Sequence, residues 1–415
     1  MSRHRVVMVA SSYPRFPGDT VGTFMEPIAH GLAARGHEVH MVLPWHPRWT
    51  RGAREGDVHF HLFRYAPHPA FNRFGYAGAL DADVRLRLRA VAAAPLALAS
   101  GWRLARRVAR DVGATVMHGH WVVPGGAIAA AAAGNRPLVV SLHGSDVYVA
   151  ERHAPARHAA RWVFRRAEVV TACSDDLRSR AVGLGAAADR SFTIPYGVDT
   201  QRFRPDPAAR TRMRDAWRVR DEAEVVIAAG RFVRKKGFEY LIDAIGRLAP
   251  GRPRLVLVLA GAGDLDAELR QRASARGIAD RVIFPGLLPQ DEIGPALAAA
   301  DVVAVPSVRD DAGNVDGLPN VVLEGLASGT PVVAFPAGGI GTVVRDGVTG
   351  LLVPERDVDG LAAAIARLLD DRALARELGG AARRWAETDA SWASTAAAFE
   401  RAYDRACRAE GVAAP

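Results

Sequence analysis

The fold of this chain is decided by a stretch that runs from Asp316 to Pro331 and reads Asp-Gly-Leu-Pro-Asn-Val-Val-Leu-Glu-Gly-Leu-Ala-Ser-Gly-Thr-Pro. Short apolar runs on either side of it are typical of fully buried parallel strands. Gly317 and Pro319 predict a tight turn, and Asn320 is expected to cap the helix that follows. A unit of strand, loop, helix and strand builds a doubly wound sheet, in which ligands bind beyond the carboxyl ends of the strands. The stretch therefore predicts an α/β fold with a ligand site at this loop.

Two acidic residues of this stretch, Asp316 and Glu324, are suited to bind hydroxyl groups. Asp316 lies on the predicted loop, where its carboxylate can accept hydrogen bonds from sugar hydroxyls. Glu324 lies on the predicted helix and can accept both hydroxyls of a ribose, which a single neutral acceptor does less well. Either acid taken alone is better explained as an ordinary turn or surface residue. The basic residues described next reverse that preference.

A basic loop earlier in the chain reads Gly230-Arg-Phe-Val-Arg-Lys-Lys-Gly237. It follows a predicted strand at 224–229 and leads into a predicted helix at 238–248, so Arg231 leaves the strand end and Lys236 lies at the helix N-terminus. Two cations in these positions, with the helix dipole behind them, are suited to a diphosphate. They can also stabilise a diphosphate leaving group without a metal ion.

The chain contains only two lysines, Lys235 and Lys236, and arginine fills the other strongly basic positions. A genome-wide preference for arginine explains this composition. A lysine retained under such a preference indicates a position where a compact ammonium group fits and a planar guanidinium group does not.

Two further predicted strands, at 254–260 and 281–284, belong to the same sheet. Gly261 and Gly263 follow the first strand, and Ile283 lies in the second. We expect backbone groups near these strand ends to contact a bound nucleotide and to read the edge of its base.

A length of 415 residues predicts two domains of about 200 residues each. We place an N-terminal domain at 1–198, a C-terminal domain at 199–388, and a final helical segment at 389–415. The only cysteines, Cys173 and Cys407, predict neither a disulfide framework nor a zinc site and fit a reducing compartment. No apolar run approaches the roughly 18 residues that a membrane span needs, and no signal peptide is recognisable, so we expect a cytoplasmic protein.

The positive charge is concentrated in the N-terminal half. Residues 1–199 contain 25 arginines against 15 acidic residues, whereas residues 200–415 contain 29 lysines or arginines against 30 acidic residues. Such an excess attracts anionic partners, which include phospholipid surfaces, lipid phosphates and nucleic acids. No nucleic-acid recognition module is visible, so we expect no nucleic-acid partner. Peripheral association with the inner face of a membrane remains as a hypothesis.

Two loops of the N-terminal half are expected to contribute to the same site. Gly22 lies between a predicted strand at 6–10 and a predicted helix at 23–35, where bare backbone admits a phosphate or a sugar. His143 follows a predicted strand at 137–142 and can bond a sugar hydroxyl or a phosphate, although a histidine at a strand end is more often structural. Neither half of the chain contains the GxGxxG fingerprint with an acid at the next strand end, which argues against an NAD-dependent dehydrogenase.

In the order and spacing of its motifs, the chain resembles the retaining glycosyltransferases of the GT-B fold, in glycosyltransferase family 4 (glycosyl transferases group 1). The resemblance is strong over residues 224–355, moderate over 5–45 and 115–200, and weak over 46–112. It is carried by Gly230-Arg231 with Lys236-Gly237, the pair Asp316 and Glu324, Ser328-Gly329-Thr330-Pro331, His143-Gly144-x-Asp146 and Tyr196-Gly197-Val198-Asp199. It implies two Rossmann-like parallel-sheet domains that face a central cleft, with the last helix crossing back to the N-terminal domain.

The resemblance also implies roles for single residues in the donor half of the site. Arg231 and Lys236 correspond to the residues that bind the donor diphosphate, and Glu324 to the acid that binds the nucleotide ribose. Asp316 and the amides of Gly317 and Leu318 correspond to the groups that hold the donor sugar. The usual residue at the first acid is glutamate, so Asp316 is one methylene shorter.

In the N-terminal half, the resemblance places His143 against the transferred sugar and Gly22 against the diphosphate and the acceptor. The acceptor itself is expected to bind at residues 44–112. The residues expected to take part in the reaction are therefore His143, Arg231, Lys236 and Asp316.

By the same resemblance, the enzyme moves a sugar from a nucleotide-diphosphate sugar to a cell-envelope, polysaccharide or lipid-linked acceptor. The anomeric configuration is kept, no metal ion is needed, and a donor phosphate oxygen takes the acceptor proton, so no general base is required. A UDP-sugar is slightly favoured over a GDP- or ADP-sugar on family frequency alone. The alternative is a catalytically silent subunit that binds a nucleotide sugar, but the presence of both cations and both acids favours the enzyme.

Overall fold

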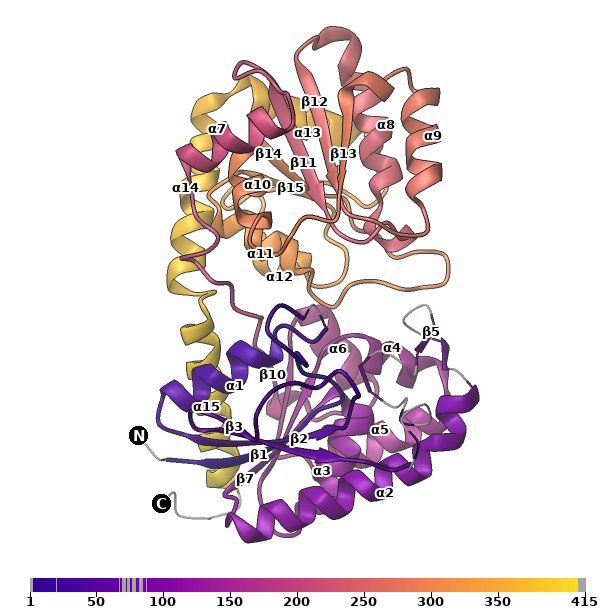
Figure 1. Cartoon of the computed structure of the whole chain (residues 1–415), viewed down its shortest axis with the longest axis vertical. Helices are drawn as coiled ribbons and strands as arrows, with labels where there is room; N and C mark the ends of the chain where they lie inside the picture. The colour runs from indigo at the N-terminus through magenta and orange to yellow at the C-terminus, as the bar shows by residue number, and fades with distance from the viewer. Residues whose placement is uncertain are drawn as a thin grey trace. The chain divides into compact units, whose positions relative to one another are not determined.

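The computed structural model describes residues 3–19, 21–66, 68, 72, 75–76, 80–81, 85–86 and 88–409, with the backbone alone for the parts of 80–92 that it includes. The chain forms two compact units, drawn in Figure 1. The first consists of Met1–Tyr196 with Trp392–Pro415, and the second of Gly197–Ser391. The sequence places these divisions after Val198 and after Thr388.

An eight-stranded sheet forms the centre of the first unit, in the order β10-β9-β8-β7-β1-β2-β4-β3. Neighbouring strands are parallel, except that β3 pairs with β4 in the antiparallel sense. Most of its side chains are apolar and buried, as expected for a parallel sheet with helices on both faces. The strands are β1 (Arg5–Val9), β2 (Glu38–Pro44), β3 (Arg54–Glu55), β4 (Val58–Phe63), β7 (Val116–His120), β8 (Leu138–Leu142), β9 (Val169–Ala172) and β10 (Ser191–Thr193).

Helices cover both faces of this sheet (Figure 1). Helix α1 packs with α15 over one face, where Phe399 and Tyr403 of α15 join the core formed by β1 and β2. Helix α2 packs against β2 and β4 over the other face. The helices of this unit are α1 (Met25–Ala34), α2 (Leu88–Asp111), η2 (Trp121–Gly126), α3 (Ala127–Ala132), α4 (Ser145–Arg152), α5 (Ala154–Arg166), α6 (Asp175–Gly183), η3 (Ala188–Arg190) and α15 (Trp392–Ala409).

A six-stranded parallel sheet forms the centre of the second unit, in the order β13-β12-β11-β14-β15-β16. The order reverses between β11 and β14, which is the topological switch point at which doubly wound sheets bind ligands. The strands are β11 (Glu224–Ala229), β12 (Leu255–Ala260), β13 (Val282–Gly286), β14 (Val302–Val305), β15 (Val332–Ala334) and β16 (Leu351–Leu352).

The helices of the second unit flank this sheet (Figure 1). They are α7 (Pro207–Ala216), η4 (Arg234–Lys236), α8 (Phe238–Leu248), η5 (Ala249–Gly251), α9 (Asp266–Ala275), η6 (Ala279–Arg281), α10 (Ile293–Ala299), α11 (Asn320–Ala327), α12 (Ile340–Val343), α13 (Val358–Asp370) and α14 (Arg372–Thr388). Among the described residues of the whole chain, no helix is long and apolar enough to span a bilayer.

The α/β fold is confirmed, but two local predictions are wrong. Asn320 is the first residue of α11 rather than its cap, because Pro319 occupies the capping position and makes no side-chain hydrogen bond there. The sequence also predicts a helix over residues 81–110, but α2 begins only at Leu88, after the short antiparallel pair β5 (Leu80–Asp81) and β6 (Arg85–Leu86). Part of the acceptor segment predicted at 44–112 lies outside the described residues, as do the last residues, 410–415, of the C-terminal segment.

Candidate functional site

The basic loop follows β11 at the switch point of the second sheet, and glycines set its path. Gly237 has a φ of 64° and ends η4 where α8 begins. A Cβ atom at this position would lie 1.9 Å from the carbonyl oxygen of Pro306, so no other residue fits. The loop therefore delivers Arg231, Lys235 and Lys236 to the N-terminus of α8, with Arg231 exposed and Lys235 buried.

Asp316 lies between the two lysines. Its Oδ1 is 3.0 Å from the Lys235 Nζ, and its Oδ2 is 2.7 Å from the Lys236 Nζ. Burial opposes ionisation of this carboxyl group, but the ammonium groups of Lys236 and Lys235 outweigh burial and hold the pKa of Asp316 well below its usual range. Asp316 is therefore an ionised carboxylate that fixes both ammonium groups.

The backbone around Asp316 is equally constrained. Gly338 has a φ of 58°, and a Cβ atom there would lie 2.0 Å from the carbonyl oxygen of Asp316. Gly317 follows on the loop, and Leu318 is buried with an exposed fraction of 6%. The loop that precedes α11 is thus held in one position by close backbone packing.

Glu324 lies within α11, the helix that follows this loop. Burial raises its pKa to about 7, against the opposing attraction of Arg202 and then of Lys236. The Nε and Nη2 atoms of Arg202 are buried and have no hydrogen-bond partner among the described residues. Unpaired buried donors are rare and commonly mark a site for a ligand or a water molecule.

Gly261 and Gly263 pack against the basic loop. A Cβ atom on Gly261 would lie 1.9 Å from the Gly230 carbonyl oxygen, and one on Gly263 would lie 2.6 Å from the Phe232 carbonyl oxygen. These glycines therefore have a structural role in positioning the loop, whatever their contact with a ligand. Ile283 lies half-buried on β13, opposite Val258 of β12.

In the first unit, His143 lies at the carboxyl end of β8 in a group of aromatic side chains. Its Nε2 is 3.0 Å from the His120 Nδ1, and its Nδ1 is 2.8 Å from the Tyr196 hydroxyl oxygen. Its ring lies 4.7 Å from that of Phe24, which follows the Gly22 loop by two residues. Burial and then His120 hold the pKa of His143 well below its usual value, so the imidazole is neutral.

The structure brings Lys236 and Asp316 into direct contact, and it brings the Gly22 loop close to His143 through Phe24. The residues that sequence reasoning did not assign to the site are Lys235 and Arg202. Lys235 had a signal, because it is one of only two lysines in the chain. No signal in the sequence indicates Arg202, because its neighbours along the chain do not show that it lies near Glu324 on α11, more than 100 residues further along.

Two parallel-sheet units, the second with a basic loop at a helix N-terminus and an acid pair on the neighbouring loop and helix, define a GT-B glycosyltransferase. The model of the family described as Glycosyl transferases group 1 matches residues 209–385, and that described as Glycosyltransferase Family 4 matches residues 21–202. The chain belongs to glycosyltransferase family 4, and it transfers a sugar from a nucleotide sugar.

Two relatives illustrate the range of the matches. The GDP-mannose-dependent alpha-(1-6)-phosphatidylinositol monomannoside mannosyltransferase of Mycolicibacterium smegmatis is 40% identical over 264 residues, which cover 63% of this chain and 68% of that protein. The glycogen synthase of Mycobacterium tuberculosis is 28% identical over 429 residues, which cover 98% of this chain and 96% of that protein.

Solved structures show the same fold. HepE of Anabaena, in complex with UDP, superposes with a TM-score of 0.74 at 21% identity and covers 96% of this chain and 99% of its own. The sucrose-phosphate synthase of Thermosynechococcus elongatus superposes with a TM-score of 0.75 at 21% identity, covering 98% of this chain and 100% of its own.

Proposed function

We propose that the protein transfers a mannosyl group from GDP-mannose to a lipid-linked saccharide, with retention of the anomeric configuration and without a metal ion. The donor is proposed from the relatives at 39–40% identity, which are named for GDP-mannose and for a phosphatidylinositol mannoside acceptor. This proposal replaces the weak preference for UDP, which rested on family frequency.

The observation that carries the proposal is the contact of Asp316 with Lys235 and Lys236 at the N-terminus of α8. A carboxylate has about four lone-pair sites, so two ammonium contacts leave capacity for sugar hydroxyls. In this arrangement Asp316 bonds the mannosyl hydroxyls while Lys236 bonds the diphosphate. The sugar and the phosphate would then be held by one continuous charged group.

The charge on the diphosphate grows as the glycosidic bond breaks, and fixed cations stabilise that growing charge most strongly in the transition state. Arg231, Lys236 and the N-terminus of α8 supply this stabilisation in the proposal. A metal ion is then unnecessary for departure of the leaving group. The acceptor hydroxyl passes its proton to a phosphate oxygen on the same face of the sugar, which accounts for retention.

Glu324 is proposed to accept hydrogen bonds from the two ribose hydroxyls, and Arg202 to bond the nucleotide with its unpaired donors. His143 is proposed to line the sugar site as a neutral group. Because both of its ring nitrogens are already hydrogen-bonded, it contacts the sugar through its ring face or by exchanging one partner.

The direct test is thermal unfolding of the full-length protein with GDP-mannose, UDP-glucose and ADP-glucose in EDTA. Binding to the native state raises the melting temperature. We expect GDP-mannose to give the largest shift and Lys236→Ala to abolish it. Transfer of labelled mannose to a phosphatidylinositol mannoside in EDTA, followed by anomeric assignment of the product by NMR, tests the reaction. A larger shift with another nucleotide sugar, or an inverted product, would contradict the proposal.

Peripheral membrane binding is proposed from helix α5 of the first unit. Its solvent-facing side carries Arg161, Arg165 and Arg166 together with Trp162, whose exposed fraction is 36%. Arginines and an exposed tryptophan on one helix face suit an anionic lipid surface, at about 1 kcal/mol per basic residue. We expect the protein to sediment with vesicles that contain phosphatidylinositol and less so at high salt. The Trp162→Ala/Arg165→Gln variant should lose most of that binding, and equal sedimentation of both proteins would refute this part.

A further inference from the structure

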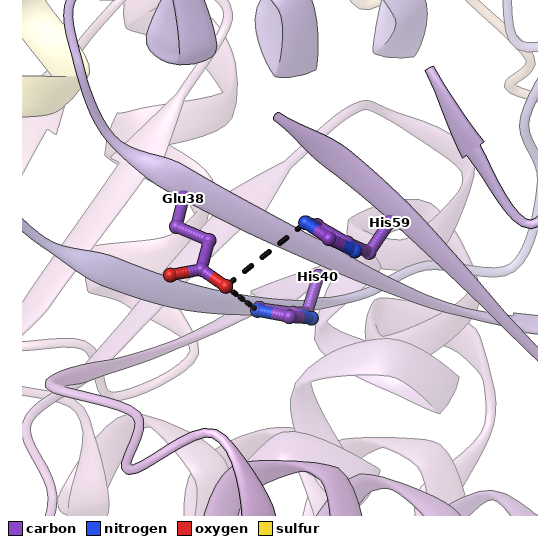
Figure 2. Close-up of side chains that lie close together, drawn as sticks. All are labelled: Glu38, His40 and His59. Atoms are coloured by element: carbon purple, nitrogen blue, oxygen red, sulfur yellow. Dashed lines mark hydrogen bonds and ion pairs between the residues drawn. The ribbon is translucent and has the colours of Figure 1, made fainter. Parts of the chain in front are cut away.

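Three histidines and a glutamate gather on one face of the first unit's sheet, and none of them is among the residues expected to take part in the reaction, His143, Arg231, Lys236 and Asp316. Glu38 and His40 alternate on β2, His59 and His61 alternate on β4, and His40 is the register partner of His59. Because side chains alternate along a strand, all four project from the same face. Figure 2 shows Glu38, His40 and His59 pointing toward one another from the two strands.

The distances among these three side chains are close to those of a metal site. The Glu38 Oε1 is 3.0 Å from the His40 Nε2 and 4.0 Å from the His59 Nε2, and one ligand atom from each residue lies within 4.8 Å of the others. A tetrahedral zinc ion with bonds of roughly 2.0–2.2 Å separates its ligand atoms by roughly 3.3 Å. Small side-chain rotations are enough to bring all three atoms to bonding distance.

The surroundings also match a metal site. The second ring nitrogen of His40, Nδ1, is 3.1 Å from the His61 Nε2, and metal-bound histidines almost always make such a second hydrogen bond. His40 is buried, whereas the side chains of Glu38 and His59 are 30% and 25% exposed, so an ion has access from solvent. Among the described residues, the only basic partners of Glu38 are these histidines, so no lysine or arginine already neutralises it.

We propose that Glu38, His40 and His59 bind one zinc ion, with water as the fourth ligand and His61 as the residue that orients His40. All three ligands lie toward the amino-terminal ends of β2 and β4, whereas substrate loops of a doubly wound sheet lie at the carboxyl ends. The ion would therefore tie β2 to β4 and stabilise the first unit without entering the transfer reaction.

A second group in the same unit shows what such a cluster looks like when it is already neutralised. Glu26, His30 and Glu55 also lie within ligand distance of one another. The guanidinium of Arg51, however, is 2.6 Å from the Glu26 carboxylate and 2.7 Å from that of Glu55. Since Arg51 supplies the positive charge there, we propose no metal at this group and use it as the matched control.

The test is isothermal titration of zinc chloride into the tag-free, full-length protein after EDTA treatment and dialysis. We expect one zinc ion per chain. Glu38→Gln and His59→Gln should each weaken binding by at least about tenfold, and His61→Phe by roughly 10- to 100-fold with unchanged stoichiometry. Both ligand positions are partly exposed, and circular dichroism should verify that the variants fold. His30→Gln should bind zinc like the unchanged protein.

Cobalt(II) gives a second readout, because a four-coordinate site produces visible absorption bands that Glu38→Gln and His59→Gln should abolish. Absence of saturable zinc binding, or equal loss in His30→Gln, would overturn the proposal. Zinc should also raise the melting temperature, while EDTA should leave the initial rate of transfer unchanged in the folded protein. A folded, metal-free protein that no longer transfers sugar would refute the structural role.

Discussion

The two units share one architecture but bury different kinds of polar group. All 13 histidines lie between His4 and His158 and so belong to the first unit, whereas both lysines belong to the second. Five histidines of the first unit are buried: His4, His37, His40, His118 and His120. Both units bury an ion pair, Arg15 with Asp19 in the first and Arg214 with Asp301 in the second, but only the first has histidines to bury.

The difference teaches how each unit tolerates polarity in its interior. An imidazole can be buried neutral if it is hydrogen-bonded, whereas a guanidinium or ammonium group keeps its charge and needs a carboxylate. In the first unit, His118 bonds Tyr403 and Ser141 at 2.8 and 2.7 Å. A histidine that is buried in the neutral form lowers the free energy of unfolding at low pH, because its imidazole is then protonated in the unfolded chain but not in the folded chain.

The largest expected effect tests the ion pairs of the second unit. The Arg214 side chain is 1% exposed and donates to the Asp301 carboxylate at 2.9 Å. Arg210 and Arg372 still pair with that carboxylate in Arg214→Ala. The substitution nevertheless leaves a cavity and removes the donor to the buried carbonyl oxygens of Ala299 and Ala223, so the free energy of unfolding should fall by about 3–5 kcal/mol in urea titrations. Arg234→Ala, at a half-exposed pair with Glu268, should change it by less than about 1 kcal/mol. A similar decrease in the free energy of unfolding in both variants would contradict the expected difference between buried and exposed ion pairs.

The next effect concerns acid sensitivity of the first unit. Burial holds the pKa of His118 and His143 well below the usual value and lowers that of His120 to about 3. In the unfolded chain the pKa of each of these histidines is about 6.5. Their contribution to the free energy of unfolding is therefore fully present above pH 6.5 and is lost as the pH falls below that value. Lowering the pH from 7.5 to 5.5 should therefore reduce the free energy of unfolding by about 1.4 kcal/mol for each of these histidines.

Hydrogen exchange at the two pH values, corrected for intrinsic rates, can separate the units. We expect β7 and β8 to lose protection at pH 5.5 while β11 and β12 keep theirs. His120→Asn should reduce the dependence on pH, and His158→Asn, at an exposed position, should not. Equal loss of protection in both units would show that the buried histidines do not set acid stability.

Transfer should depend on the charged group of the second unit. Lys236→Ala should lower kcat/KM by roughly 100- to 1000-fold, because a fixed charge that acts on the leaving group is removed. Lys236→Arg should recover little, since the planar fork does not replace the ammonium contact with Asp316. Arg247→Ala, on α8 but half-exposed and paired with Asp359, should leave steady-state rates unchanged. Full activity of Lys236→Ala would remove the basic loop from the mechanism.

The smallest effect concerns Glu324. Because burial raises its pKa to about 7, the carboxylate proposed to bond ribose is mostly protonated at pH 6 and mostly ionised at pH 8. The affinity for GDP-mannose, measured by calorimetry, should therefore rise by about tenfold between these values. The diphosphate of GDP-mannose does not titrate in this range, so Glu324→Gln should bind equally at both pH values. A pH dependence that persists in Glu324→Gln would place its origin elsewhere.

Much of the fold could be predicted from the sequence because local signals were strong. Continuous apolar runs followed by glycine predicted β11, and the amphipathic pattern after Gly237 predicted α8, both with the bounds found in the structure. The helix expected from Asp81 was wrong over its first residues, where β5 and β6 pair with each other as a separate two-stranded antiparallel sheet.

The site was predictable only where chemistry lies in one local motif. Loop and helix patterns in the sequence predict Asp316, Glu324 and Lys236 as site residues. The contact of Lys235 with Asp316, in contrast, depends on the turn η4 and on a distant loop. The group formed by Glu38, His40 and His59 was not predicted from the sequence for a related reason. Its alternating residues are visible on each strand, but the register that sets His40 beside His59 is a property of the sheet.

Helix α15 has a consequence for how the protein is made. Phe399, Tyr403 and Cys407 complete the core beneath β1 and α1, although the ribosome synthesises them about 360 residues after that helix. The core of the first unit therefore cannot be completed until α15 has been synthesised. Until then part of its apolar surface stays exposed, while the entire second unit is translated and can already fold. Folding during synthesis should run in reverse order of the sequence, and a chaperone that covers α1 would protect the nascent chain during that interval.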